Sequence, residues 1–214
     1  MKNRIISIIS LLLFFIFNIL WITKHTRLMV IEQIALVILS VTFYLVAAFF
    51  EVNRIKDLKK KSVVIKTFAL FLLLYYLFFI ATVVFLDGYF FSRGASFASN
   101  KIFFKTIKSY MIQFSNGRIL VALGNLIGNA ILLVPLALLL PMLNSIFKKW
   151  YVFLFTTTFI SAFIEYQQFK LSLGSADVDD ILLNVFGSFV AFLLFQGVID
   201  LFGFKNNNLE DNPK

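Results

Sequence analysis

The sequence predicts an all-α, polytopic membrane protein: a bundle of about six transmembrane helices with an amphipathic helix in the outer membrane interface. Apolar residues make up 60% of the 214-residue chain, 29 residues are Phe, and the mean hydropathy is +0.91. A soluble surface could not cover so many apolar side chains. In addition, six apolar segments are each about long enough to cross a hydrocarbon core of ~30 Å at ~1.5 Å per residue. They are residues 5–22, 28–50, 63–86, 119–143, 150–169 and 181–204.

Composition also excludes several classes of site. The chain has no Cys, so it can form neither a disulfide framework nor a thiolate metal site nor a cysteine nucleophile. Its single His, His25, lies far from the acidic residues, which argues against a Ser-His-Asp triad or a multi-histidine zinc site. We attribute the formal net charge of +9 to basic residues in loops that contact anionic lipid. We therefore expect membrane lipid, and no nucleic acid, among the partners.

Three regions follow from the apolar pattern. Residues 1–62 contain two transmembrane helices and a basic cytoplasmic loop, residues 63–204 contain a core of four transmembrane helices with an outer loop at 87–118, and residues 205–214 form a polar, disordered tail. The first apolar run lacks a small-residue cleavage site, so we interpret it as a span and not as a signal peptide. Basic residues concentrate in the loop 51–62, which places both termini in the cytoplasm.

A cluster of carboxylates and amides interrupts the last three apolar segments at their outer ends. Ionisable side chains at the edge of a bilayer usually persist because they form a site. We expect Asp179 to face away from the stripe that the other polar residues form, and the pair Gly124 and Gly128 to let another helix approach closely. The cluster contains Asn125, Asn129, Glu165, Gln168, Asp177, Asp179, Asp180 and Asn184.

A purely structural interpretation of the same residues stays open. Acidic residues in the first turn of a helix are stabilised by the helix dipole by roughly 0.3–1 kcal/mol. The three aspartates begin the sixth segment, so they could serve only as caps, and the asparagines could serve only as hydrogen-bonding groups between helices.

The outer loop contains a second amphipathic element at residues 101–114. The pattern predicts a helix in the membrane interface that roofs the polar cluster, with an ordinary solvated helix or a loop packed on the spans as alternatives. Its two faces consist of Lys101, Lys105 and Lys108 on one side, and Phe103, Phe104, Ile107, Tyr110, Met111 and Phe114 on the other.

Over residues 65–200 these motifs resemble the VanZ-like membrane proteins. Two positions depart from that family's pattern: Phe103 stands where the family has Pro, and no Arg precedes Asp177. The motifs are Asn125-Leu126-Ile127-Gly128-Asn129 followed by Leu133-Val134-Pro135-Leu136, the segment Asn100 to Ile107 with Arg93 upstream, Glu165-x-x-Gln168, and Asp177-Val178-Asp179-Asp180-x-x-x-Asn184-x-x-Gly187.

The resemblance implies a link to reduced sensitivity to teicoplanin-type lipoglycopeptides, although a housekeeping role in the cell envelope fits it equally. We expect an outer polar pocket that binds an amphiphilic envelope molecule, either a lipid-linked wall precursor or the antibiotic. The residues expected to contact it are Arg93, Asn100, Asn125, Asn129, Gln168, Asp179 and Asn184.

Two other functions remain open at this point. One is an intramembrane hydrolase or transferase acting on an envelope lipid, in which Glu165, Asp177 and Asp180 serve as acid and base or hold Mg²⁺ or Ca²⁺. The other is a non-catalytic partner of a second membrane protein.

Overall fold

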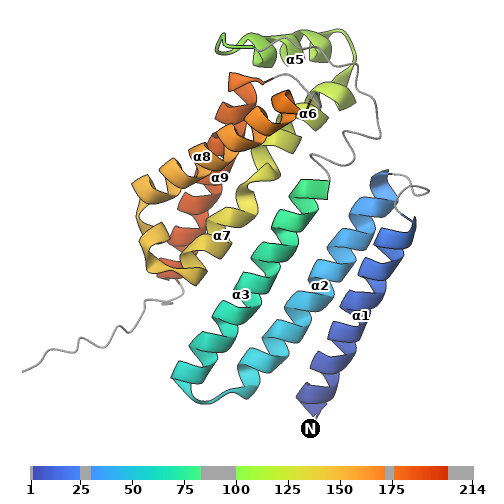
Figure 1. The fold of residues 1–214 in the computed structure, drawn as a ribbon, viewed down its shortest axis with the longest axis vertical. Helices are drawn as coiled ribbons and strands as arrows, with labels where there is room; N and C mark the ends of the chain where they lie inside the picture. Colours follow the sequence, from blue (N-terminus) through green and yellow to red (C-terminus); the bar gives the residue numbers. More distant parts are fainter. Residues whose placement is uncertain (1, 25–29, 83–99, 172–175, 202–214) are drawn as a thin grey trace, which may run out of the picture. The chain divides into compact units, whose positions relative to one another are not determined.

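The structure, a computed structural model, describes residues 2–24, 30–82, 100–171 and 176–201. All regular elements in these ranges are helices, which confirms the predicted all-α class (Figure 1). The chain divides into two compact units, residues 1–69 and 70–214, and the division falls within α3. The helices are α1 (Lys2–Lys24), α2 (Val30–Arg54), α3 (Leu58–Ala81), α5 (Lys105–Ser115), α6 (Ile119–Leu132), α7 (Val134–Leu143), η3 (Ser145–Lys148), α8 (Trp150–Lys170) and α9 (Val178–Leu201).

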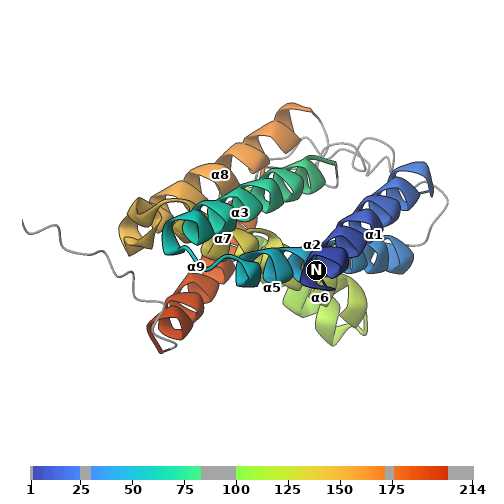
Figure 2. The same ribbon diagram turned by 90° about the horizontal axis from the view of Figure 1, so that it is seen from below.

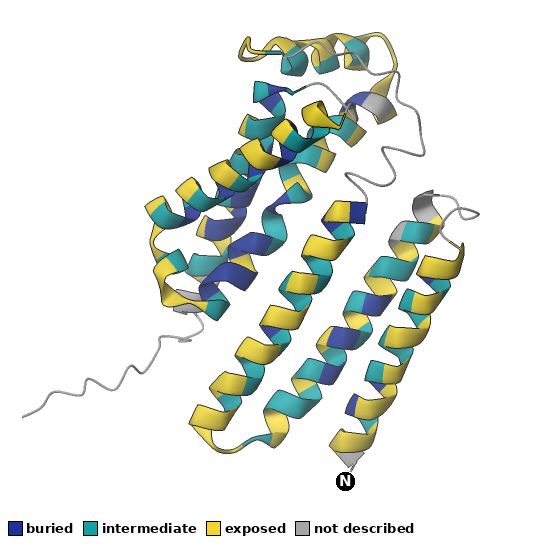
Figure 3. Cartoon of the chain, in the orientation of Figure 1, coloured by how far each residue is buried: buried dark blue, intermediate teal, exposed yellow. Residues whose placement is uncertain are grey.

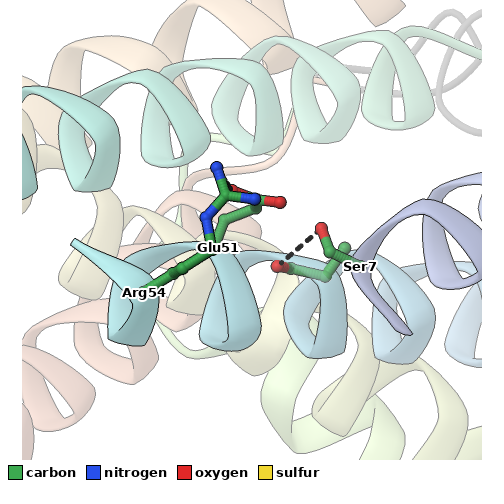
Figure 4. Close-up of polar contacts among 4 residues, drawn as sticks. Ser7, Glu51 and Arg54 are labelled. Atoms are coloured by element: carbon green, nitrogen blue, oxygen red, sulfur yellow. Dashed lines mark hydrogen bonds and ion pairs between the residues drawn. The ribbon is translucent and has the colours of Figure 1, made fainter. Parts of the chain in front are cut away.

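In the first unit α1 packs along α2 through small residues. Ser7 is buried and donates a hydrogen bond of 3.4 Å to the carbonyl of Ala47, which is also buried (Figure 4). The Phe17 and Phe43 rings stack at a centroid distance of 5.6 Å. Small residues at such contacts let two backbones approach in a medium where apolar side chains gain nothing by leaving lipid.

The loop predicted at residues 51–62 is shorter in the structure. Helix α2 continues to Arg54 and α3 begins at Leu58, because the Asp57 carboxylate accepts hydrogen bonds from the backbone N–H groups of Lys59 (2.8 Å) and Lys60 (3.2 Å). A carboxylate that caps the first free N–H groups of a helix stabilises its start. The basic residues of this region therefore extend the helix instead of forming an open loop.

The core of the second unit lies where α7 and α8 contact α9 (Figures 1, 2). Leu133, Leu136 and Phe153 are almost completely buried, and the Phe153 ring stacks on Phe192 at 4.6 Å. Away from this core the helices expose large apolar side chains, among them Phe155, Phe159 and Phe186 (Figure 3). An apolar outer surface is what lipid contact requires.

The fourth predicted span, 119–143, is a broken helix. Pro135 lies in the first turn of α7, directly after the junction at Leu133, where a missing N–H group is tolerated. The N–H group of Leu136 bonds to Leu133 and not to Leu132, and the freed Leu132 carbonyl accepts a hydrogen bond from the Tyr76 hydroxyl. A side chain from α3 thus satisfies the backbone group that the break exposes.

Five helical stretches in the described part of the chain are long and apolar enough to cross a membrane: Asn3–Lys24, Ala35–Arg54, Leu58–Ala81, Ala122–Leu143 and Val178–Gly197. The chain is therefore a multi-pass membrane protein. Helix α8, the predicted fifth span, has 21 residues but is not among them. Its Thr, Ser, Glu and Gln side chains lower its mean hydropathy, and the crossing by α8 stays a prediction.

The close approach between helices occurs at a different glycine from the expected pair. Neither Gly124 nor Gly128 has an atom within 4 Å of the position that a Cβ would occupy. Gly187 of α9 instead lies against the backbone of Ala130 in α6, where a Cβ would lie 2.6 Å from the carbonyl carbon. Among the described residues, the close helix approach expected at Gly124 and Gly128 therefore occurs at Gly187 instead.

Substitution of Gly187 by Ala is expected to separate α6 from α9. The added methyl group overlaps the Ala130 backbone, and overpacking of this kind costs about 1–3 kcal/mol of unfolding free energy. Unfolding in mixed micelles, followed by circular dichroism, measures the change. The matched control is Gly128→Ala, which meets open space and gains about 0.5–1 kcal/mol of helix stability. Equal stabilities of the two variants would contradict the α6–α9 contact.

Candidate functional site

The end of α8 and the start of α9 bring the predicted acidic residues together. Glu165 is buried near the end of α8, and its Oε2 accepts a 3.0 Å hydrogen bond from the backbone N–H group of Asp177. One turn further into the bundle, the Asn184 amide donates to the Ser161 hydroxyl at 2.9 Å. Two polar contacts therefore join α8 to α9 on one side of the pair.

Asn100 connects a distant segment to the same place. Its backbone pairs with the start of α9 in a short parallel bridge, with Asn100 N–H to the Ala176 carbonyl at 2.9 Å and Val178 N–H to the Asn100 carbonyl at 3.2 Å. The Asn100 side chain donates to Asp177 Oδ1 and to the Thr106 hydroxyl, each at 3.0 Å. Asn100 therefore holds the segment before α5 against α9.

Asp177 uses both carboxylate oxygens in this junction. Oδ1 accepts from the Asn100 amide and from the backbone N–H group of Asp179 at 2.9 Å, while Oδ2 accepts from the Thr106 hydroxyl. With both oxygens engaged, Asp177 is a connecting residue in this structure, and the catalytic role expected for it stays a prediction.

Asp179 has a function that the sequence did not indicate. Its side chain is fully buried against the start of α5, and the expectation that it faces away from the stripe stays a prediction. Its Oδ1 accepts from the N–H group of Phe104 at 2.6 Å, and its Oδ2 accepts from Thr106 at 2.7 Å and Ile107 at 3.3 Å. These are N–H groups of the first turn of α5, whose own preceding side chain provides no cap. Asp179 therefore caps a helix other than its own.

Asp180 lies on the other side of the α9 start, toward α6. Its Oδ1 accepts a hydrogen bond from the Asn129 amide, which brings together two residues predicted to share the site. Asp180 is also close enough to Glu165 and Asp177 for their like charges to interact. Four carboxylates thus lie within one small region, and no described Lys or Arg forms an ion pair with any of them.

Two oxygens of this cluster remain available. Among the described residues, no hydrogen bond reaches Glu165 Oε1 or Asp180 Oδ2, and neither atom is completely buried. By contrast, the Asn184 Oδ1 atom is buried without a hydrogen-bond partner. A carboxylate oxygen that is open and unpaired can accept a hydrogen bond from a ligand. The cluster therefore divides into a connecting pair, Asp177 and Asp179, and an available pair, Glu165 and Asp180.

A shallow hollow of about 240 Å³ lies beside the cluster, between α8 and α9. Asn100, Lys101, Glu165 and Asp177 line it together with apolar residues of both helices. Within the described ranges, no group of three His, Asp or Glu side chains is placed to hold a metal ion. The described residues of the hollow suit hydrogen bonding to a ligand.

The remaining predicted site residues have varied placements. Arg93 lies outside the described residues. Asn125 and Gln168 are half-buried, and no contact places either beside the available oxygens. Ser161, which shares the helical spacing of Glu165, accepts from the Asn184 amide. Thr106, which the sequence analysis did not single out, donates to Asp177. No sequence signal separated Thr106 from the other hydroxyl residues of the outer loop.

The predicted amphipathic helix at 101–114 is present, but it begins at Lys105 and ends at Ser115. In Figure 1 it lies across the end of the bundle, and it contacts α6 and α9. Ile107 and Tyr110 are half-buried toward these helices, while Lys105 and Lys108 are exposed. The aromatic face thus packs partly on the bundle, and Phe103 and Phe104 precede the helix. Placement of α5 in the interface stays a prediction.

The site lies within a stretch that matches a known family model. The VanZ/LLP1 model matches residues 66–201, more than half of the chain. The chain belongs to the VanZ/LLP1 family. Neither a curated protein nor a solved structure gives a significant match. The VanZ/LLP1 region includes Asn100, Glu165 and all three aspartates of the junction, whereas α1 and α2 precede it. This membership confirms the resemblance that the motifs indicated.

Proposed function

We propose that this VanZ/LLP1 protein binds the polar head of an amphiphilic cell-envelope molecule at Glu165 and Asp180. The observation that supports the proposal is the pair of carboxylate oxygens, Glu165 Oε1 and Asp180 Oδ2, which accept no hydrogen bond from the described residues and are not completely buried. A carboxylate oxygen that receives no hydrogen bond from the protein can accept one from a ligand.

The chemistry of the pair defines the class of ligand. Two carboxylates without a described cationic partner favour hydroxyl or ammonium donors, as in the sugars and amines of envelope molecules. The hollow that Glu165 lines also has Lys101 and apolar side chains from α8 and α9 in its lining, which suit a phosphate or carboxylate and the start of a lipid chain. A lipid-linked wall precursor or a lipoglycopeptide combines these features. By binding one of them, the protein would lower sensitivity to teicoplanin-type antibiotics.

An enzymatic function rests on the same two residues. Acid–base catalysis needs carboxylates that can exchange protons, and Glu165 and Asp180 each have one oxygen without a hydrogen bond from the described residues. Binding of a fluorescent lipoglycopeptide and of a lipid-linked precursor to the protein in nanodiscs tests recognition. Analysis of the recovered lipid by mass spectrometry tests turnover. Variants at Glu165 and Asp180 are compared with the native chain in both measurements.

Access from outside the cell requires that the start of α9 face outward. The positive-inside rule favours this orientation, because the basic stretch near Asp57 lies at a helix end predicted to be cytoplasmic. The chain has no Cys, so single cysteines can report sidedness. An impermeant thiol reagent applied to intact cells should label Ser109→Cys in α5 and should label Ser145→Cys in η3 only after lysis. The reverse pattern would place the site inside.

A further inference from the structure

We propose that the turn Lys101–Lys105 is a membrane-inserting wedge that binds the anionic surface of the lipid leaflet beside the site. Its three central side chains are large, apolar and consecutive, and each is mostly exposed: Ile102 at 64%, Phe103 at 60% and Phe104 at 65%. An exposed lysine flanks them on either side. Large apolar side chains that stay exposed together mark a contact surface.

The hydrogen bonds of the junction place this turn at the level where a span begins. The Phe104 N–H group is 2.6 Å from Asp179 Oδ1, and Asn100 pairs with Val178. Val178 is the first residue of the candidate span Val178–Gly197. The backbone of the turn therefore lies beside the start of this candidate span. Its apolar side chains can enter the leaflet without any movement of the helices.

The turn is held in a conformation that keeps its side chains outward. The Asn100 side chain accepts from the Ile102 N–H group at 3.1 Å. Phe104 has a φ of 64°, a left-handed conformation that bulky residues rarely adopt. The Asp179 carboxylate holds the Phe104 N–H group in this conformation. A prearranged turn loses less conformational entropy when it inserts than a flexible loop would.

Charge complementarity identifies the lipid surface as the occupant. Lys101 and Lys105 lie on both sides of the apolar residues, where they can meet phosphate headgroups while the phenylalanines enter the acyl region. A second copy of this chain would bring its own lysines against the same pair. The contact between two copies would then set like charges against each other.

Single cysteines in this cysteine-free chain test the wedge. Phe103→Cys and Ser109→Cys are each labelled with a nitroxide, and the protein is reconstituted in vesicles of phosphatidylcholine and phosphatidylglycerol. Both side chains are exposed, so neither change opens a cavity in the core. The nitroxide at 103 should collide with dissolved oxygen and be shielded from a water-soluble nickel chelate, whereas the nitroxide at 109 should show the opposite preference.

Equal access of the nickel chelate to both positions would overturn the proposal. Strong spin–spin broadening at 103 between copies would also overturn it, because it would show that a second chain occupies the turn. The lysines are tested by Lys101→Gln with Lys105→Gln in the chain labelled at 103, and access of the nickel chelate should rise. Unchanged access of the nickel chelate in that variant would show that the lysines do not bind the turn to an anionic lipid surface, and would overturn that part of the proposal.

Discussion

Replacement of Asp179 by Asn is expected to detach α5 from the start of α9. The native carboxylate accepts three backbone hydrogen bonds on two oxygens, from Phe104, Thr106 and Ile107. An asparagine retains one acceptor oxygen, and its NH₂ group would face N–H groups that also donate. The first turn of α5 would then lose its cap as well as the negative charge near its N-terminus.

The expected loss is about 3–5 kcal/mol in the free energy that closes α5 onto the bundle, the range observed when one partner of a buried charged network is removed. Such a change would leave α5 detached from the bundle in most molecules. Amide hydrogen exchange in nanodiscs measures it: protection should fall at α5 and at Asn100, whereas α7 and the buried part of α9 should exchange as in the native protein. Loss of protection throughout the unit would mean that Asp179 supports the whole fold and not α5 alone.

Asp57 provides a matched control for this substitution. Its carboxylate also accepts two backbone N–H groups at a helix start, but it is exposed and uses only one oxygen. Asparagine is as good a cap as aspartate at such a position, so Asp57→Asn should leave the exchange of α3 nearly unchanged. If both variants behaved alike, burial and the second oxygen of Asp179 would have no special effect.

The helices could be predicted because composition and helical periodicity act locally. A run of apolar residues long enough to cross a bilayer has few alternatives to a helix, since every backbone group must be paired inside lipid. The ends of the helices were predicted less accurately, because a helix end depends on single contacts. Helix α3 begins at Leu58 because one exposed carboxylate caps it, and that contact depends on a single residue and not on any periodic pattern.

The site could be predicted only in part, because periodicity tells which residues share a face and not what that face contacts. Asp180 and Asn129 were expected in one site, and they form a hydrogen bond. The partner of Asp179, however, lies 75 residues earlier in the chain at Phe104, and no spacing rule connects them. Likewise, Gly128 fits a helix-packing motif, yet the close approach occurs at Gly187, whose neighbour in space is set by how the broken helix α6–α7 meets α9.

Replacement of the available carboxylates is expected to weaken recognition while leaving the fold intact. In Glu165→Gln the amide oxygen can still accept the hydrogen bond from Asp177, and in Asp180→Asn it can still accept from Asn129. The NH₂ group then occupies the open position, so an acceptor with a negative charge becomes a neutral donor. Loss of one charge-assisted hydrogen bond corresponds to roughly ten- to hundred-fold weaker binding.

Binding to nanodiscs and the antibiotic tolerance of cells that express each variant measure this effect together. Neutral amides are less costly than acids in apolar surroundings, so the amount of inserted protein should not fall. Glu51→Gln is the control, because it makes the same chemical change at an acid that pairs with Arg54 at 3.2 Å in the other unit. It should bind like the native protein.

If Glu165→Gln binds normally but turnover drops by roughly 10²–10⁴-fold, the site is catalytic. Native binding and native tolerance in both variants, at normal abundance, would show that these two oxygens recognise nothing and that the acidic cluster serves only to join α5, α6, α8 and α9.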